Sequence, residues 1–146
     1  MATVLVVGGA GYIGSHMVCA LLEQGHRVVT FDNLSAGHRD AVLGGEFVQG
    51  DLIHPAEIQA VFEKWPIDAV MHFAAFAQVG ESVIAPAKYY LNNVTATIHL
   101  LESMRLANVG RFIFSSTGAT FGEPAYSPID EAHPQRPINP YGRTKW

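Results

Sequence analysis

Three regularly spaced glycines directly after an apolar run are the residues of this chain whose chemistry is easiest to interpret. The run Thr3–Val7 is followed by Gly8, Gly11 and Gly14, and then by an amphipathic helical pattern. Backbone without side chains at these places can turn sharply, offer its N–H groups to a phosphate and let the next helix pack closely on a sheet. The pattern predicts a dinucleotide-binding turn, with an ordinary tight turn as the alternative.

A second set of side chains with chemical potential lies near residue 146. Tyr141 and Lys145 are four residues apart, and Asn139 as N-cap and Pro140 in the first turn predict that a helix begins just before them. Residues at this spacing share a helix face, so an ammonium can lie beside a phenol there and lower the pKa of the phenol from about 10 toward neutrality. Such a pair is common by chance. Here it follows the glycine turn and two polar strand ends, in the order that a nucleotide-dependent enzyme requires.

Alternating strand and helix patterns must position these residues. Apolar runs predict five strands, at 3–7, 27–31, 46–49, 67–73 and 111–114. Helical patterns follow Gly14 and begin at Pro55 and Pro86, the last continuing through Leu106, while five of the eight prolines make 122–140 a loop. Such alternation is typical of an α/β fold with a doubly wound parallel sheet, in which ligands bind at the carboxyl ends of the strands.

Acidic residues stand at two of these predicted strand ends. Asp32 follows the second strand, where a carboxylate accepts both hydroxyls of an adenosine ribose and repels a 2′-phosphate. This position favours NAD over NADP, and capping of its own loop is the alternative. Asp51 follows the third strand and is placed to bond the adenine amino group, with Leu52 over the ring. Helix capping explains Asp51 almost equally well.

Small residues and hydroxyls follow the fourth and fifth strands. The run Phe73–Ala77 allows a second phosphate or the nicotinamide ribose to approach the backbone, and the hydroxyl-rich segment 115–120 is expected to point into the ligand crevice. Asn92 and Asn93 are poor helix formers inside a helical pattern. They indicate either a polar partner for one of them, such as a bound cofactor, or an exposed pair.

Composition excludes several other classes of protein. A length of 146 residues, 49% hydrophobic content and a formal net charge of −4 fit one soluble domain without the basic face of a nucleic-acid binder. Cys19 is alone, so no internal disulfide forms, and we expect it to be a buried apolar residue. His72 and His99 have no second ligand at metal spacing, which predicts structural histidines and no metal. The first apolar run is too short for a secretory signal or a membrane span, and a cytoplasmic location is expected.

Taken together, the motifs resemble those of the extended short-chain dehydrogenase/reductase family, and in particular its NAD-dependent epimerases and dehydratases of nucleotide sugars. The resemblance covers the whole chain, as the N-terminal part of such a protein. It is carried by the segments 8–16, 32–34, 50–52, 72–75, 79–83, 90–94, 114–117 and 140–145.

The resemblance implies a UDP-sugar 4-epimerase with tightly bound NAD. Tyr141 would take the proton of the sugar 4-hydroxyl while the C4 hydride passes to NAD, Thr117 would bond the same oxygen, and Lys145 would hold the ribose. A 4-keto sugar that rotates and is reduced on its other face interconverts UDP-galactose and UDP-glucose. Gly118 follows Thr117 where related dehydratases carry acidic residues, which weighs against dehydration. Other UDP-sugars remain open, because the residues that grip them would lie beyond residue 146.

Spacing and resemblance together give the expected site residues. The catalytic ones are Thr117, Tyr141 and Lys145. The cofactor-binding ones are Gly8, Gly11, Tyr12, Ile13, Gly14, Asp32, Asn33, Asp51, Leu52, Phe73, Ala74, Ala75, Asn92, Asn93, Ser115, Tyr141 and Lys145.

The length of the chain sets further expectations. Residues 1–146 are expected to form an NAD-binding Rossmann domain that lacks the later strands and a substrate domain. A helix that begins at Pro140 has fewer than two turns here and is marginal in isolation, so Tyr141 and Lys145 are expected to be poorly ordered. The unpaired sheet edge predicts self-association or marginal stability. A nucleotide-binding module without turnover is the alternative function.

Overall fold

The structure, a computed structural model, describes residues 1–146 and divides into two compact units. The sheet unit consists of Met1–Ala75 and Ala96–Ser115. The helical unit consists of Phe76–Thr95 and Ser116–Trp146. Each unit therefore contains two stretches of chain, and each is described by itself.

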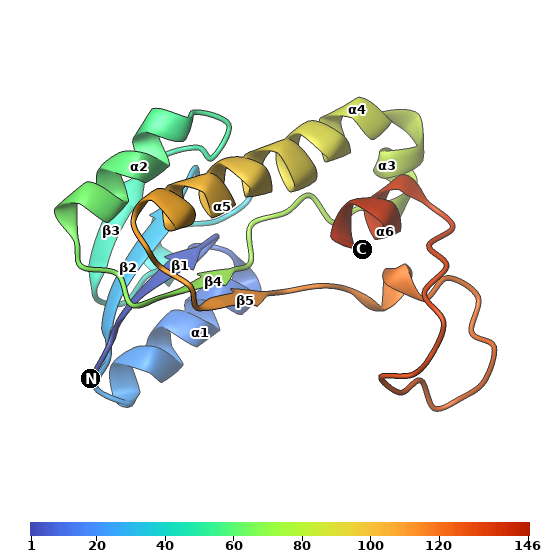
Figure 1. Cartoon of the computed structure of the whole chain (residues 1–146), viewed down its shortest axis with the longest axis horizontal. Helices are drawn as coiled ribbons and strands as arrows, with labels where there is room; N and C mark the ends of the chain where they lie inside the picture. The colour runs from blue at the N-terminus through green and yellow to red at the C-terminus, as the bar shows by residue number, and fades with distance from the viewer. The chain divides into compact units, whose positions relative to one another are not determined.

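The sheet unit is built on a five-stranded parallel sheet with the strand order β3-β2-β1-β4-β5 (Figure 1). This order confirms the predicted Rossmann-type, doubly wound fold, in which the chain works outward from β1 in both directions. The strands are β1 (Thr3–Val7), β2 (Arg27–Asp32), β3 (Glu46–Gln49), β4 (Ala69–His72) and β5 (Phe112–Phe114).

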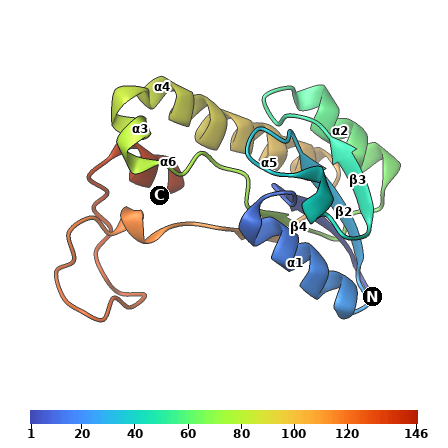
Figure 2. The same cartoon turned by 180° about the vertical axis from the view of Figure 1, so that it is seen from behind.

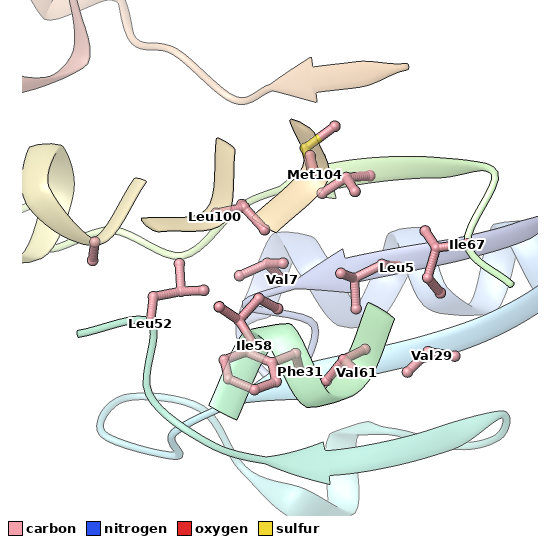
Figure 3. Close-up of a cluster of buried hydrophobic side chains, with 12 residues drawn as sticks. Leu5, Val7, Val29, Phe31, Leu52, Ile58, Val61, Ile67, Leu100 and Met104 are labelled. Carbon is pink, nitrogen blue, oxygen red and sulfur yellow. The ribbon is translucent and has the colours of Figure 1, made fainter. Parts of the chain in front are cut away.

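Helices cover both faces of this sheet. Helix α1 (Tyr12–Glu23) lies on one face, and α2 (Pro55–Lys64) and α5 (Ala96–Leu106) lie together on the other (Figures 1 and 2). Side chains of β1 alternate between the two layers: Leu5 and Val7 pack toward α2 and α5, as Figure 3 shows, and Val4 and Val6 pack with α1. Burial on both faces is the reason why this strand is an unbroken apolar run.

The helical unit is a group of short elements joined by loops. They are α3 (Val79–Ile84), α4 (Pro86–Tyr89), a π-helical turn (Tyr90–Thr95), a 3₁₀ turn (Gly118–Thr120) and α6 (Pro140–Lys145). Among its hydrophobic residues only Tyr89 is buried. Its other buried side chains are Pro137 and six polar or charged ones: Ser82, Asn93, Thr120, His133, Thr144 and Lys145.

Most predicted elements are confirmed, and three differ. The helix predicted from Pro86 to Leu106 contains the π-helical turn at the two asparagines, which sequence periodicity does not reveal. Helix α3 was not expected, because six residues are too few for apolar periodicity to identify a helix. The fourth strand is shorter than the predicted 67–73. No helix has the length and apolar character needed to cross a membrane.

Candidate functional site

The glycine turn between β1 and α1 depends on close backbone contacts. Gly8 has φ +80° and its N–H donates to the carbonyl of Phe31 at 2.8 Å. A Cβ on Gly8 would lie 2.5 Å from the nitrogen of Ala74, and one on Gly14 would overlap the carbonyl oxygen of Gly8. Two of the three predicted glycines are therefore required by the fold itself.

Gly11 is different, because nothing in the protein fills the space beside it. It is the N-cap of α1 with φ −78°, and a Cβ there would have only the Gly8 oxygen near it, at 3.4 Å. No side chain caps the helix and its first turn contains no acidic residue. Tyr12 and Ile13 are 83% and 60% exposed. The turn thus presents an open, positively polarised helix N-terminus, which suits an anion such as a pyrophosphate.

The Asp32 carboxylate holds the glycine turn and the loop that follows β2. Its Oδ2 accepts the N–H of Ala10 at 2.9 Å, and its Oδ1 accepts the N–H of Leu34 at 2.8 Å. The alternative of a loop-capping aspartate is therefore confirmed. Each carboxylate oxygen can accept more than one hydrogen bond, so capping and ribose recognition are compatible. The side chain is 8% exposed.

The loop after β3 is held by side chains from its surroundings. The Asp51 carboxylate accepts the side-chain amide of Asn33 at 2.9 Å and the N–H of Ile53 at 3.0 Å. The N-cap of α2 is His54, so Asp51 caps its own turn and does not cap the helix. Leu52 belongs to the apolar core, with only a small part of its surface exposed. Adenine contacts of Asp51 and Leu52 remain predictions.

Both histidines considered for metal binding have protein partners. The Nδ1 of His99 lies 2.9 Å from the carbonyl oxygen of Leu52, and the Nε2 of His72 lies 3.0 Å from the hydroxyl of Thr97. No group of histidine, cysteine or acidic residues is arranged to hold a metal ion. The interpretation of His72 and His99 as structural residues is confirmed.

The residues after β4 and β5 lie at the carboxyl edge of the sheet. Phe73 and Ala74 both donate their N–H groups to the carbonyl of Val7, at 2.8 and 3.1 Å. Ser115 donates its N–H to the carbonyl of His72 at 3.1 Å. Ala74 is the residue that a Cβ on Gly8 would meet, so a small side chain at 74 accompanies the close approach of the backbone. Ala75 follows at the end of the same segment.

In the helical unit, α6 carries the predicted catalytic pair. Asn139 caps it by accepting the N–H of Gly142 at 2.7 Å, as predicted. A Cβ on Gly142 would lie 2.5 Å from the carbonyl oxygen of Ala119, so the helix packs directly on the 3₁₀ turn. The expectation of poor order is wrong for this structure, because the cap and these contacts compensate for the short helix.

Lys145 is buried rather than solvated. It is 4% exposed, and burial lowers its pKa to about 8 from the ordinary 10.5. The side chain still carries its proton at neutral pH, so a positive charge is held inside the helical unit.

The two asparagines lie in the π-helical turn and have partners within the protein. Asn93 accepts the N–H of Phe76 at 2.9 Å and donates to the carbonyl of Phe76 and to the hydroxyl of Thr144, each at 3.0 Å. Asn92 donates to the Asn93 oxygen at 2.9 Å. Asn93 is buried, so the exposed-pair alternative is wrong for it. A cofactor contact of either asparagine remains a prediction.

Thr117 and Ser116 belong to the segment that precedes the 3₁₀ turn. The Thr117 hydroxyl accepts the N–H of Ala119 at 3.2 Å and is partly exposed. The Ser116 hydroxyl donates to the carbonyl of Lys145 at 2.9 Å and ties this segment to the end of α6. A hydrogen bond from Thr117 to a substrate oxygen remains a prediction.

Sequence reasoning missed a buried aromatic residue next to Tyr141. The Tyr89 ring meets the Tyr141 ring edge-on, with 6.4 Å between centroids, and its hydroxyl donates to Glu81 at 2.8 Å. In the sequence Tyr89 is one of several apolar residues in a helical pattern. No local signal distinguishes it from the exposed Tyr90 beside it.

Comparisons with known proteins agree with this architecture. Residues 4–146 match the model of the NAD dependent epimerase/dehydratase family. A UDP-glucose 4-epimerase of Rhizobium leguminosarum bv. trifolii is 51% identical over 144 residues, which are 99% of this chain and 44% of that protein. A putative UDP-arabinose 4-epimerase of Arabidopsis thaliana is 47% identical, over 97% of this chain and 35% of its own length.

Solved structures give the same result. The crystal structure of UDP-glucose 4-epimerase from Brucella ovis in complex with NAD has a TM-score of 0.97 and 54% sequence identity, covering 99% of this chain and 45% of that one. This chain thus spans less than half the length of the relatives that it matches. A five-stranded parallel sheet, a glycine turn and a family match over 4–146 lead to one conclusion. The chain belongs to the NAD dependent epimerase/dehydratase family.

Proposed function

We propose that this chain is the cofactor-binding part of an NAD-dependent UDP-sugar 4-epimerase. The observation that carries the proposal is the open turn at Gly11, at an uncapped helix N-terminus that follows the first strand. Relatives of about half identity are UDP-glucose 4-epimerases, and a similar solved structure holds NAD. The substrate favoured by these names is UDP-glucose or UDP-galactose. The Arabidopsis relative keeps a UDP-pentose as a second candidate.

The residues of the sheet unit fit a dinucleotide. A pyrophosphate at the α1 N-terminus needs room for its oxygens, and the missing side chain of Gly11 leaves that room. The N–H of Gly11 itself donates to the carbonyl of Gly8, so the first turn of α1 would have to supply the N–H groups. Asp32 is held by two backbone N–H groups, so its carboxylate is fixed in place for the hydroxyls of a ribose and opposes a 2′-phosphate. These features support NAD rather than NADP. Asn33 and Asp51 hold each other and would border the adenine.

The residues of the helical unit supply groups that hold and move a proton. Tyr141 would take the proton from the sugar 4-hydroxyl and return it in the reverse step, and Thr117 would donate a hydrogen bond to the same oxygen. Lys145 keeps its charge at neutral pH and would hold a ribose hydroxyl of the cofactor. Bound NAD would supply the hydride acceptor that becomes the donor after the sugar rotates.

The proposal is tested by binding and turnover measured separately. Purified chain is titrated with NAD by calorimetry, and it is incubated with UDP-galactose while UDP-glucose is assayed. NAD binding with turnover that Tyr141→Phe abolishes supports the proposal. Binding without turnover assigns the chain to a non-catalytic nucleotide module, and a lack of NAD binding contradicts the proposal.

We also propose that a second copy of the chain is its partner. Strand β5 is at the edge of the sheet, and Ile113 in it is 55% exposed. An exposed edge strand with apolar side chains favours pairing with another chain. Sedimentation velocity at several concentrations tests this, and a monomer at all of them, with a single cooperative thermal transition, excludes the self-association.

A further inference from the structure

Tyr89 is the one hydrophobic residue that is buried in the helical unit. Its exposed fraction is zero, although it lies in a helix of only four residues between α3 and the π-helical turn. The neighbouring Tyr90 is 43% exposed. A large side chain in a unit with few other buried apolar groups must be held by specific contacts.

The hydroxyl end of Tyr89 is fixed by two hydrogen bonds. It donates to Oε2 of Glu81 at 2.8 Å and accepts the N–H of Gln78 at 3.1 Å. Glu81 is itself held by Lys88, whose Nζ is 2.6 Å from Oε1. The ammonium of Lys88 also lies over the ring of Phe76, 4.5 Å from its centroid. The phenol is thus anchored to a connected set of polar groups.

The ring end of Tyr89 meets two other aromatic rings. The Tyr141 ring is edge-on to it, at 6.4 Å between centroids and an interplanar angle of 75°. The Phe76 ring lies at 5.9 Å and 56°. Edge-to-face aromatic pairs have a preferred geometry, so a fixed ring restricts the orientations that its partner can adopt. Tyr141 is half-buried and sits in the first turn of a short helix, where this restriction matters most.

We propose that Tyr89 is a positioning residue for Tyr141: its ring, anchored through Glu81 and the Gln78 N–H, holds the Tyr141 phenol in one orientation. This inference rests on the proposed function for its importance, since Tyr141 is the proposed proton-transfer group. The contacts themselves do not depend on a cofactor or a substrate.

The protonation state of Tyr89 agrees with a positioning role rather than a proton-transfer role. Burial raises the pKa of Tyr89, and its hydrogen bond to the Glu81 carboxylate raises that pKa further. Tyr89 therefore stays protonated and neutral where a catalytic phenol must ionise. A neutral ring can brace Tyr141 without adding a negative charge beside it. Because its proton is committed to Glu81, the Tyr89 hydroxyl does not compete for the proton that Tyr141 would move.

The test is NMR spectroscopy of the full 146-residue chain labelled with ¹³C in its tyrosine rings, without cofactor. Tyr141→Phe assigns the Tyr141 signals. We expect one set of Tyr141 ring signals with cross-relaxation to Tyr89 in the unaltered chain. Tyr89→Leu and Tyr89→Met remove the ring and should shift the Tyr141 signals to those of an exposed, averaged tyrosine. Tyr89→Phe keeps the ring but loses the hydroxyl that bonds Glu81 and the Gln78 N–H, so its Tyr141 signals should lie between those of the unaltered chain and those of the Leu variant.

Two controls separate positioning from folding. Tyr90→Leu changes the exposed neighbour and should leave the Tyr141 signals unchanged. The N–H of Gly142, bonded to Asn139, reports whether α6 persists. Loss of Tyr141 ring order with a protected Gly142 N–H supports the proposal. Unchanged Tyr141 signals in both the Leu and Met variants overturn it, and so does loss of α6 or of the fold in both, since Tyr89 would then be a packing residue.

The proposed function is assessed independently by NAD calorimetry and the UDP-galactose assay on the same samples. An ordered Tyr141 in a chain that neither binds NAD nor turns over the sugar would remove the proposed function and leave the role of Tyr89 intact. A chain that binds NAD while its Tyr141 signals are the same in the Tyr89 variants would leave the proposed function intact and remove the positioning role of Tyr89.

Discussion

The sheet unit and the helical unit are each stabilised internally by a different kind of interaction. In the sheet unit, apolar side chains from β1, β2 and β4 fill two layers, and the candidate cofactor site depends on backbone geometry at Gly8, Gly11 and Gly14. In the helical unit, Tyr89 is the only buried hydrophobic residue apart from Pro137, and side-chain hydrogen bonds from Asn93 to Thr144 and from Ser116 to the Lys145 carbonyl hold α6. A site made of backbone tolerates little change of shape, whereas a site made of side chains depends on each partner group.

This difference has a consequence for stability within the molecule. Burial of apolar surface is the dominant favourable contribution to folding, and hydrogen bonds add little net stability while being costly to leave unmade. We therefore expect local opening to require less free energy in the helical unit than in the strands of the sheet unit. Amide hydrogen exchange measures local opening directly, and slower exchange in α6 than in β1 would contradict this expectation.

The largest expected effect is in the glycine turn. Gly14→Ala places a methyl group on the Gly8 carbonyl oxygen and should lower the free energy of unfolding by about 3 kcal/mol, in the manner of an overpacked core. Gly11→Ala is the matched control, because its methyl group meets open space and its φ suits alanine. Its cost should stay within about 1 kcal/mol, the usual loss on replacing an N-cap residue by alanine. Urea unfolding of the two variants decides, and equal losses would contradict a backbone-built site.

A somewhat smaller loss is expected from Asn93→Ala in the helical unit. The substitution leaves the N–H and carbonyl of Phe76 without their side-chain partner and removes one of the two hydrogen bonds of the Thr144 hydroxyl, at a cost of about 2 kcal/mol. Hydrogen exchange should accelerate in α6. Asn92→Ala is the control, since the one side-chain bond found for Asn92 is to Asn93. If both substitutions had the same small effect, the helical unit would not depend on this amide.

The fold and the candidate site could be predicted from the sequence to a greater extent in the sheet unit than in the helical unit, and the reason is physical. Strand β1, the glycine turn and Asp32 lie within the first 32 residues, and local periodicity with turn chemistry identifies them. Asn93 and Thr144 are 51 residues apart, and their hydrogen bond leaves no trace in spacing. The same holds for Tyr89 and Tyr141, where an ordinary helical pattern conceals the one fully buried ring of the unit.

A pH effect of intermediate size is expected from Lys145. Its pKa in the folded chain is about 8, below the ordinary 10.5, so between these values the unfolded chain binds a proton that the folded chain does not. Stability should therefore rise with pH across this window and be independent of Lys145 titration below it. Thermal melts of the unaltered chain and of Lys145→Met, compared from pH 7 to pH 10, isolate this contribution. A stability difference that does not change with pH would mean that the ammonium is solvated.

The smallest expected effect is an increase in stability, from a substitution in β2 next to the glycine turn. The hydroxyl of Thr30 in β2 is buried and has no hydrogen-bond partner. Thr30→Val keeps the shape and removes the unsatisfied group, which should raise the free energy of unfolding by about 1 kcal/mol. Thr97→Val is the comparison, because the Thr97 hydroxyl is bonded to His72 and its loss should destabilise. Destabilisation by Thr30→Val would show that the hydroxyl has a partner after all.

The central claim is that the sheet unit of this chain forms a dinucleotide site from its own backbone. Calorimetric titration with NAD of the unaltered chain and of Gly11→Ala tests it most directly. We predict one molecule of NAD bound per chain, weaker binding of NADP because of Asp32, and at least about a tenfold loss of NAD affinity in the folded Gly11→Ala variant, equivalent to about 1.4 kcal/mol. Equal NAD affinity of the two chains, or the absence of binding to the unaltered chain, would contradict the claim.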